Sequence, residues 1–385
     1  MTYREARTEA AARLRRAGIK EDRGESLLLL EAVLKRDHFA DGNARGGTPS
    51  GEEISGCGTL EEEKSDHDDS GAEISGCAFR EGNSGHSDLR EEISGKSVPD
   101  VRTFYLLHQS EEMPHRQLEA YLELTDRRCT RFPLQYLTGI CYFMGLPMEV
   151  NPSVLIPRQD TEILAEEALR LLRAELSGSA EQRMAGHPEN QKSSEKSEER
   201  GRKGLKELKE RNRKSPGLRV LDLCTGSGCL AVSLKAYCPE LTVTGSDCSA
   251  AALEIAARNA AANGQEVEWI ESDLFAGISG EYDMIVSNPP YIPHRVIDTL
   301  QPEVRFFEPR LALDGGEDGL VFYREIAAAA GAHLVPGGRI LLEIGSDQGE
   351  AVSRLLASHS FSDIKVLPDL AGLDRVATGR REQYV

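Results

Sequence analysis

The sequence predicts an α/β fold, in which a parallel β-sheet carries helices on both faces and follows a small α-helical part. Three observations lead to this prediction. From residue 219 onward, short β-rich runs alternate with helical runs. Before about residue 130, the apolar residues show only helical spacing. Two polar stretches, 41–100 and 177–217, lack the apolar side chains that a core requires. The 385 residues therefore divide into two folded parts and two inserts.

The N-terminal part, residues 1–130, is predicted to be a small helical domain interrupted by the insert at 41–100. The rest of the chain, residues 131–385, is predicted to be a second domain interrupted at 177–217. Alanine and leucine recur at helical spacing in three runs of the first domain. The three runs are 3–17, 25–34 and 116–129.

The first insert repeats itself, as EEISG at 52–56, AEISG at 72–76 and EEISG at 91–95. Three copies spaced by about 20 residues could indicate a solenoid, but each copy has one isoleucine as its only sizeable apolar residue and cannot bury a core. We therefore expect disorder. The second insert is almost wholly polar. Its basic end, GLKELKERNRK, could form a loose helix, but a solvated linker is favoured.

The β-rich runs of the second domain are expected to form one sheet. Sheets of this class bind ligands at the carboxyl ends of their strands, so the residues that follow each run are candidates for a site. The runs are RVLDLC (219–224), LTVTGSD (241–247), VEWIESD (267–273), YDMIVSN (282–288), RILLEIG (339–345) and IKVLPDL (364–370).

Composition restricts the classes of function. The net charge is −18, and residues 41–100 contribute 15 Asp and Glu against 5 Lys and Arg. An acidic body repels nucleic-acid phosphates, which counts against a DNA-binding enzyme without excluding one. No apolar run approaches the roughly 20 residues of a membrane span, and the N-terminus lacks the apolar region of a secretory signal, so we expect a cytoplasmic protein. The eight cysteines show no CxxC pair and no zinc-like spacing; we expect reduced thiols and no metal site.

A glycine-rich turn follows the first strand, in the stretch LDLCTGSGCLA with Asp222, Thr225, Gly226 and Gly228. Such a turn between a strand and a helix lets the backbone approach a ligand closely and presents amide N–H groups. The spacing D-x-x-x-G-x-G differs from the G-x-G-x-x-G of dinucleotide-binding folds. A tight turn that simply needs glycine is the alternative explanation.

Acidic residues end the next two strands. Asp247 could accept hydrogen bonds from two ribose hydroxyls. In ESDLF, Asp273 and Phe275 could reach the edge and the face of an adenine, and Leu274 lies between them. Each aspartate alone is equally well explained as a helix N-cap. Together with the glycine turn, and without a P-loop lysine, they indicate a nucleoside-bearing cofactor that lacks a triphosphate, which favours S-adenosylmethionine.

The fourth strand ends in SNPPY, with Asn288, Pro289, Pro290 and Tyr291. The prolines remove backbone donors and fix the chain path, so that carbonyls and the asparagine side chain point into a pocket. The Asn288 amide oxygen and the Pro289 carbonyl could accept both N–H groups of a planar –NH2, while Tyr291 stacks on the group that carries it. Two such acceptors would direct the nitrogen lone pair towards a sulfonium methyl and stabilise the growing positive charge. Prolines that merely end the strand are the alternative.

The combination of D-x-x-x-G-x-G and NPPY resembles the amino-methyltransferases that act on DNA, RNA and protein glutamine. Further segments resemble one family, the peptide-chain release factor glutamine methyltransferases (HemK/PrmC), over about residues 130–385 apart from the second insert. These segments are PLQYLTG (133–139), NPSVLIPRQDTE (151–162), SNPPYIP (287–293), EPRLALDGGEDGL (308–320) and LLEIG (341–345).

This resemblance implies a Rossmann-like class I S-adenosylmethionine-dependent methyltransferase fold with a small α-helical N-terminal domain that grips the release factor. It implies methylation of the glutamine side-chain nitrogen in the Gly-Gly-Gln loop of bacterial class I release factors. The alternative is a DNA or RNA exocyclic-amine methyltransferase that uses the same NPPY pocket. The acidic body and the lack of a target-recognition domain argue against nucleic acid as the substrate.

The resemblance also implies roles for individual residues. The glutamine amide would be held by Asn288 and the Pro289 carbonyl, with Tyr291 packed against it. The segment Ile156 to Glu162 would form a wall of the site, where Arg158 either belongs to a structural turn or takes part directly in catalysis. The implied cofactor-binding set is Asp222, which supports the turn, with Thr225, Gly226, Gly228, Asp247, Asp273, Leu274, Phe275 and Asn288.

Overall fold

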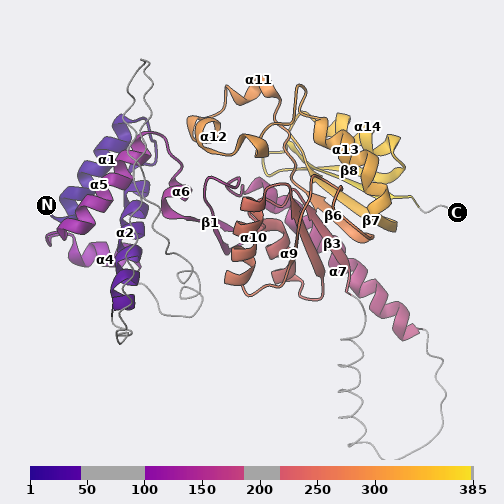
Figure 1. The fold of residues 1–385 in the computed structure, drawn as a ribbon, viewed down its shortest axis with the longest axis horizontal. Helices are drawn as coiled ribbons and strands as arrows, with labels where there is room; N and C mark the ends of the chain where they lie inside the picture. The colour runs from indigo at the N-terminus through magenta and orange to yellow at the C-terminus, as the bar shows by residue number, and fades with distance from the viewer. Residues whose placement is uncertain (45–99, 186–216, 383–385) are drawn as a thin grey trace, which may run out of the picture.

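The structure, a computed structural model, describes residues 1–44, 100–185 and 217–382 (Figure 1). The predictions for the EEISG repeats and for the basic end of the second insert concern residues outside these ranges. Helices from the N-terminal part lie beside an α/β part that contains the large sheet (Figure 1). Among the described helices, none combines the length and the apolar character that crossing a membrane requires.

The helical part forms its own core. α1 begins with a capping box, in which Thr2 and Glu5 each accept the other's backbone N–H, and it buries Ala6, Ala10 and Leu14 on one face. All three predicted helical runs are confirmed as helices, whereas α4 was not predicted. The elements are α1 (Tyr3–Arg16), α2 (Asp22–Ala44), α4 (Val101–His108), α5 (His115–Cys129) and α6 (Leu134–Thr138).

A buried ion-pair cluster joins the helical part to the α/β part. The Arg128 side chain on α5 is 7% exposed and donates to Glu25 on α2 (Nε–Oε2 2.6 Å) and to Glu303 (Nη1–Oε1 3.1 Å). Arg131 also donates to Glu303, at 2.8 Å. Glu303 lies on α12 (Pro302–Phe307), a short helix of the α/β part. One carboxylate therefore connects the two parts of the chain.

Apolar contacts continue across the same junction. Phe132 and Phe307 pack edge to face with ring centroids 5.1 Å apart. Leu137 on α6 is buried with the helical core, so this core extends past residue 130. The domain boundary near residue 130 stays a prediction.

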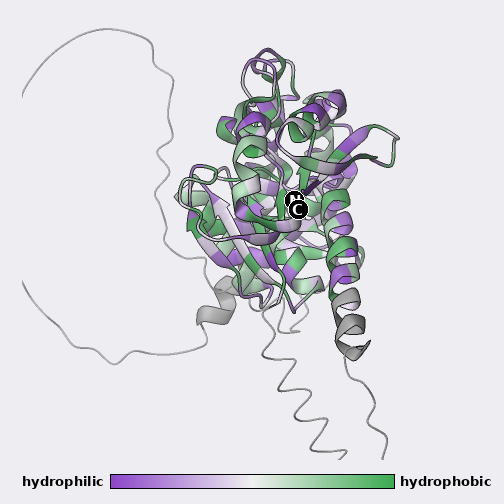
Figure 2. Cartoon of the chain, turned by 90° about the vertical axis from the view of Figure 1, so that its right-hand side faces the viewer, coloured by the Kyte–Doolittle hydropathy of each residue, from purple (hydrophilic) through white to green (hydrophobic). Residues whose placement is uncertain are grey.

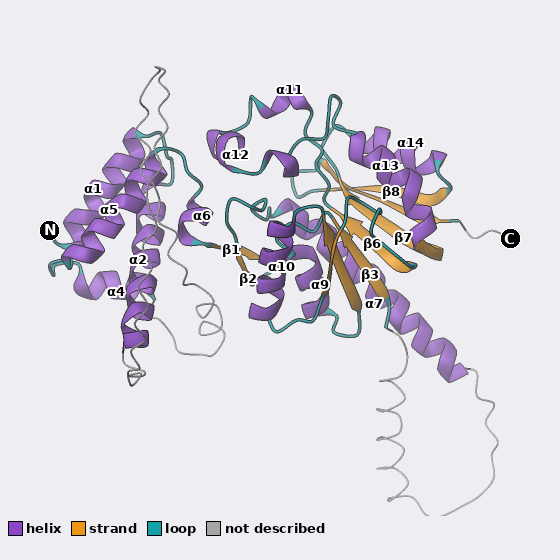
Figure 3. Cartoon of the chain, in the orientation of Figure 1, coloured by secondary structure: helices purple, strands orange, loops and turns teal. Residues whose placement is uncertain are grey.

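The α/β part contains a seven-stranded sheet in the order β5-β4-β3-β6-β7-β9-β8. Figure 3 labels its strands β3, β6, β7 and β8. The five strands from β5 to β7 are parallel, as predicted, but β9 runs antiparallel to both of its neighbours. The prediction of an all-parallel sheet was wrong at this edge because the short turn at 369–373 permits only a hairpin. The strands are β3 (Arg219–Leu223), β4 (Thr242–Asp247), β5 (Glu268–Glu271), β6 (Tyr282–Ser287), β7 (Leu334–Glu343), β8 (Phe361–Pro368) and β9 (Asp374–Arg381).

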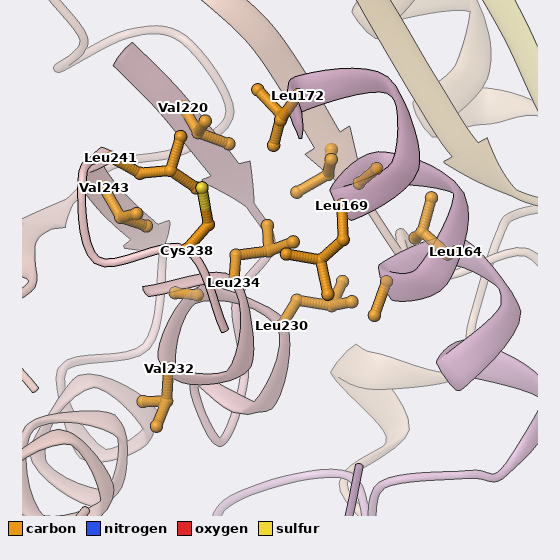
Figure 4. Packing of buried hydrophobic residues seen from close by; sticks show 14 of the residues in the cluster. Leu164, Leu169, Leu172, Val220, Leu230, Val232, Leu234, Cys238, Leu241 and Val243 are labelled. Carbon is orange, nitrogen blue, oxygen red and sulfur yellow. The ribbon is translucent and has the colours of Figure 1, made fainter. Parts of the chain in front are cut away.

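Both faces of the sheet are covered by helices, and successive strand residues enter opposite cores. Val220 of β3 packs with α7 and α9, whereas Leu221 packs on the other face with α13 and α14. Figure 4 shows leucines of α7 facing Leu230 and Leu234 of α9. The covering helices are α7 (Asp160–Ala185), α9 (Cys229–Tyr237), α10 (Ala250–Ala262), α13 (Val321–Ala330) and α14 (Gly349–Ser358).

The outer helices carry both hydrophilic and hydrophobic residues along their length, as expected for helices that bury one face (Figure 2). A hairpin that was not predicted lies against α10, where Glu149 pairs with Arg258 at 2.8 Å. All six cysteines within the described ranges are free thiols. The remaining elements are β1 (Ile140–Phe143), β2 (Leu146–Glu149), α11 (His294–Ile297), η1 (Arg310–Ala312) and η2 (Gly331–His333).

The strand order reverses direction beside β3. From β3 the chain proceeds outward through β4 to β5, and then returns to place β6 on the other side of β3. The connections that leave the carboxyl ends of β3 and β6 therefore diverge and leave a crevice between them. The sheet order alone places the candidate site there.

We expect Arg128→Ala to destabilise the protein by about 3 kcal/mol, because removal of one partner from a buried ion pair leaves the others unpaired. Urea denaturation would measure this change. Arg116→Ala, on the exposed side of the same helix, is the matched control and should change stability by less than about 0.5 kcal/mol. Equal stability of the two variants would show that the cluster does not hold the junction together.

Candidate active site

A cavity of about 370 Å³ opens at the carboxyl ends of β3, β4 and β6. Its walls come from the turn after β3, the tips of β4 and β5, the NPPY segment after β6, and two segments far apart in the sequence, 153–161 and 309–312. The structure thus brings together residues from strands that are distant along the chain. The predicted site residues that line the cavity are Thr225, Gly226, Asp247, Asp273, Leu274, Asn288 and Pro290.

Asp222 lies below the glycine turn and is fully buried. Its Oδ2 accepts hydrogen bonds from the Thr225 hydroxyl (2.5 Å) and from the backbone N–H of Ala231 (3.1 Å). Burial raises its pKa to about 7, while these hydrogen bonds oppose that rise. Asp222 therefore holds the turn through Thr225 and does not line the cavity, and its assignment to the cofactor-binding set stays a prediction.

The two glycines of the turn have different surroundings. Gly226 has φ +55°, and a Cβ at this position would meet nothing within 4 Å, so a side chain there would enter the cavity. A Cβ on Gly228 (φ +78°) would instead lie 2.9 Å from Ala256 and Trp269. Gly228 does not line the cavity, and close packing of α9 accounts for the glycine. Its assignment to cofactor binding stays a prediction.

Asp247 projects from the tip of β4 into the cavity. Its Oδ2 accepts the Gly226 N–H (2.9 Å) and its Oδ1 accepts the Ser249 N–H (3.0 Å). Burial raises the pKa of this carboxyl, and the backbone hydrogen bonds act against the rise. Each carboxylate oxygen keeps acceptor capacity for a further hydroxyl, as recognition of a ribose requires.

The three residues predicted at the tip of β5 differ in whether they line the cavity. Asp273 is exposed and lines the cavity, and Leu274, in the left-handed region at φ +44°, also lines it. Phe275 is buried outside the cavity lining and stacks on His333 with ring centroids 4.7 Å apart. The role of Phe275 against an adenine therefore stays a prediction.

These features fit S-adenosylmethionine. The open space at Gly226 allows close approach of a ligand, and the Asp247 carboxylate offers the acceptors that a ribose needs. The cavity wall also contains apolar side chains such as Leu274 and Leu311. Within the described residues there is no cluster of His, Cys, Asp and Glu able to hold a metal ion.

The NPPY segment reaches the same cavity. Asn288 lines it, and its Nδ2 donates to the Thr161 hydroxyl at 3.2 Å. Pro290 also lines the cavity, whereas Pro289 is buried and Tyr291 lies behind the wall with its hydroxyl 3.4 Å from Glu343 Oε1. Because Asn288 uses Nδ2 on the protein side, its Oδ1 is available as an acceptor for a substrate.

Residues 313–315 form backbone hydrogen bonds with Ile292, directly after the NPPY segment. Ile292 donates to the Leu313 carbonyl (3.0 Å) and accepts from the Gly315 N–H (2.9 Å). A Cβ on Gly315 would lie 2.8 Å from the Tyr291 backbone. The Gln348 side chain also donates to the Tyr291 carbonyl at 3.0 Å. Position 315 therefore requires glycine, because the two backbones pack too closely there for a side chain.

Comparison with known proteins agrees with this geometry. Residues 202–307 match the family model "Methyltransferase small domain", and residues 101–139 match "PrmC N-terminal domain". A release factor glutamine methyltransferase of Geobacter sulfurreducens is 40% identical over 265 residues, which cover 69% of this chain and 78% of that protein. The enzyme of the same description from Agrobacterium fabrum is 40% identical over 295 residues, or 76% of this chain and 88% of that protein.

The chain belongs to the release factor glutamine methyltransferase family. Membership confirms the predicted family, the class I methyltransferase fold with a helical N-terminal domain, and an S-adenosylmethionine-dependent protein-glutamine methyltransferase. The roles of individual site residues are not tested by these comparisons.

In this member of the release factor glutamine methyltransferase family, Arg158 links two walls of the cavity. Its guanidinium lies 2.5 Å from Glu308 Oε1, and Glu308 Oε2 accepts the Ile156 N–H at 3.3 Å. The Glu308 side chain is 1% exposed, and burial raises its pKa although Arg158 opposes the rise. Arg158 also lines the cavity, so its position is compatible with both roles considered from the sequence.

Three residues near the site were not assigned from the sequence. Thr161 contacts Asn288, Glu343 lies behind Tyr291, and Gln348 holds the NPPY backbone. Thr161 and Glu343 fall within segments already compared with the family, IPRQDTE and LLEIG. The one signal in the sequence was Glu343 itself, a glutamate that ends a run of apolar residues and so lies at the carboxyl end of a strand. Glu162, the last residue of the segment predicted as a wall of the site, accepts the Met144 N–H (2.7 Å) and so holds the β1–β2 hairpin.

We expect Asp247→Ala to weaken S-adenosylmethionine binding by roughly 1–3 kcal/mol, because the ribose would lose a charged acceptor in a buried setting. Titration calorimetry would measure the affinity. Asp298→Ala, an aspartate with a 68% exposed side chain at the end of α11, is the matched control and should bind as the wild type does. An unchanged affinity of the Asp247 variant would place the ribose contact elsewhere.

We expect the stability of the protein to depend less on pH in Asp222→Asn than in the wild type. The pKa of Asp222 rises from 3.8 to about 7 in the folded state. The stabilisation from its bound proton is complete below the unfolded value and is lost as the pH rises through about 7. Urea denaturation at about pH 5 and about pH 8 should therefore show a smaller loss in the variant. Equal losses would mean that Asp222 titrates alike in both states.

Proposed function

We propose that the chain transfers a methyl group from S-adenosylmethionine to the side-chain amide nitrogen of the glutamine in the Gly-Gly-Gln loop of bacterial class I release factors. The observation that carries the proposal is the meeting of Asn288 with Asp247 and Gly226 in one cavity. On this proposal, one cavity provides both the site for a planar –NH2 group and the site for a ribose.

The amide-binding side of the site consists of fixed acceptors. Asn288 Oδ1 and the Pro289 carbonyl accept the two N–H groups of the substrate amide, while Tyr291 supports the segment from behind. These acceptors direct the nitrogen lone pair towards the methyl carbon. An amide nitrogen is a poor nucleophile because its lone pair is conjugated, so positioning is the first requirement for reaction.

The same acceptors stabilise the charge that develops during transfer. When bound, S-adenosylmethionine supplies a methyl group activated by its sulfonium. As the bond from nitrogen to methyl carbon forms and the bond from sulfur to methyl carbon breaks, positive charge grows on the nitrogen. Asn288 Oδ1 and the Pro289 carbonyl oxygen face that charge with the negative ends of their dipoles. The proton then leaves the nitrogen for solvent, and no side-chain base is required before transfer.

The cofactor side of the site would be formed by the turn and the strand tips. Asp247 would hold the ribose hydroxyls, Gly226 would allow close approach, and Thr225 would line the site while it is fixed by Asp222. Asp273 and Leu274 at the tip of β5 would contact the adenine.

Recognition of the release factor requires a second surface, because one planar amide cannot distinguish one glutamine from another. The helical domain is the candidate for this surface. It is joined to the catalytic part through Glu303 on α12, and the next residue after that helix is Glu308, which pairs with Arg158 at the cavity wall. A docking domain connected in this way can use remote binding energy to place the substrate glutamine. Because release factors act on ribosomes, the proposed substrate also implies a cytoplasmic enzyme.

Radiolabelled methyl transfer from S-adenosylmethionine tests the proposal. The full chain should label a purified class I release factor at the Gly-Gly-Gln glutamine, and should leave duplex DNA and tRNA unlabelled. Substitution of that glutamine in the release factor should abolish labelling. Preferential labelling of DNA or tRNA would overturn the proposal and would support the nucleic-acid alternative.

We expect Asn288→Ala to lower kcat by about 10²- to 10³-fold, the usual loss when one preorganised polar contact is removed. Affinity for S-adenosylmethionine, measured by calorimetry, should stay within about twofold of the wild type, because the ribose site is intact. Turnover equal to the wild type would remove Asn288 from the chemistry.

A further inference from the structure

We propose that Trp269 is a positioning residue for the cofactor, because its indole ring packs against both β4 and the glycine turn and so fixes the turn over the strand. The ring does not line the cavity, and the sequence assigned it no role. The inference rests on the proposed placement of S-adenosylmethionine, in which the ribose lies at Asp247 and the cofactor passes close to Gly226.

The position of Trp269 in the sheet directs its side chain across β4. Trp269 lies on β5, the edge strand, and its register partner on β4 is Gly245. The partner of Gly245 on β3 is Asp222, the residue that holds the turn. Partners in register share one face of a sheet, so these three residues form a row beneath the turn. The half-buried ring packs with the core that includes α9.

The middle residue of this row is glycine because the ring occupies the space of a side chain. A Cβ on Gly245 would lie 2.3 Å from Cζ3 and 2.7 Å from Cε3 of the Trp269 ring. The backbone of Gly245 does not itself require glycine, since its φ is not positive. A glycine inside a strand weakens the strand and marks a place where another group approaches closely. Here that group is the indole.

The far edge of the ring reaches the turn itself. A Cβ on Gly228 would lie 2.9 Å from Cη2 of Trp269. Gly228 is the N-cap of α9, and its N–H donates to the Thr225 carbonyl (2.9 Å), which closes the turn. The ring therefore contacts β4 on one side and the last residue of the turn on the other.

The distance between the turn and β4 governs the groups proposed to bind the cofactor. The Thr225 N–H donates to the Ser246 carbonyl (2.9 Å), and the Gly226 N–H donates to Asp247 Oδ2 (2.9 Å). Both acceptors belong to the end of β4, directly after Gly245. Without the ring, the turn could settle towards the strand and change both hydrogen bonds. The Asp247 carboxylate would then no longer be held in one direction for the ribose hydroxyls.

The alternative is that Trp269 only fills the core beside the sheet. On that alternative, a smaller apolar residue lowers the stability of the fold and leaves the cofactor site as it was. On the proposal, the smaller residue also weakens binding of S-adenosylmethionine. Affinity, measured separately from melting temperature, distinguishes the two.

The first experiment removes the ring. Trp269→Val keeps a residue suited to a strand but cannot reach the turn. We expect the Kd for S-adenosylmethionine, measured by calorimetry, to rise at least about tenfold, equivalent to about 1.4 kcal/mol. Leu172→Ala is the control, because Leu172 is fully buried in the same core on α7 and does not line the cavity. It should lower the melting temperature and leave the Kd within about twofold of the wild type.

A double-mutant cycle tests whether the ring acts through its contact with β4. Gly245→Ala places a methyl group where the ring lies, so the Kd should again rise at least about tenfold. In a Trp269→Val background the methyl group has room, and adding Gly245→Ala should change the Kd by less than about twofold. Losses that multiply in the double variant would overturn the proposal, as would an unchanged Kd in Trp269→Val. If Trp269→Val does not fold, an unchanged Kd in Gly245→Ala overturns it.

Tryptophan fluorescence shows whether Gly245→Ala acts by moving the ring. Trp269 is the single tryptophan of the 385-residue chain, so the emission spectrum reports its surroundings alone. The ligand-free Gly245→Ala variant should differ from the wild type in emission. Weakened binding with an unchanged spectrum would overturn the proposal, because the loss would not pass through the ring.

These measurements need no methyl acceptor, so they hold whether the wild type methylates a release factor or a nucleic acid. Asp247→Ala in the same calorimetry tests the placement of the ribose separately. If Asp247→Ala binds as the wild type does while Trp269→Val and Gly245→Ala do not, the ribose placement fails and the support of the turn by Trp269 stands.

Discussion

Burial of both sheet faces is the constraint on which the rest of the structure depends. Alternate residues of β3 enter cores on opposite sides, under α7 and α9 on one face and under α13 and α14 on the other. A strand buried in this way has room for chemistry only where it ends. The reversal of strand order beside β3 then leaves the ends of β3 and β6 open to one crevice. Asp247, the glycine turn and the NPPY segment meet there because the strands that carry them have nowhere else to expose polar groups.

The residues at strand ends were predictable from the sequence for the same reason. Asp247 and Asn288 each end a β-rich run, and both line the cavity. The antiparallel edge was missed because β9 (DRVATGRR) looks too polar for a buried strand and was not recognised as one, so the hairpin that the short turn after β8 requires was not seen. Thr161 was missed for a different reason. Its partner is 127 positions away in the chain, and no local pattern reports a contact of that separation.

The loop between the NPPY segment and residues 313–315, which includes α12, connects the helical domain to the site. Glu303 receives hydrogen bonds from Arg128 and Arg131 of the helical part, and α12 leads directly to Glu308, which pairs with Arg158 at the cavity wall. Three ion pairs, two at Glu303 and one at Glu308, thus join the helical domain to the cavity wall over a few residues of backbone. The helical domain and the cavity wall are therefore connected by a short series of packed contacts, namely the ion pairs of Glu303 and Glu308 and the backbone of α12 between them.

The polar groups of the site divide by what they touch. Asp247 and Asn288 face the cavity, whereas Asp222 and Glu343 are buried behind it, and burial raises the pKa of each of the latter to about 7. A buried carboxylate opposes folding, yet each of these two accepts a hydrogen bond at the site. Asp222 accepts from the Thr225 hydroxyl, and Glu343 accepts from the Tyr291 hydroxyl behind the cavity wall. In its ionised form each acid only accepts, so it fixes the direction of the hydroxyl that meets it. The two buried acids therefore hold the Thr225 hydroxyl at the cavity wall and the Tyr291 hydroxyl behind it, before any substrate arrives.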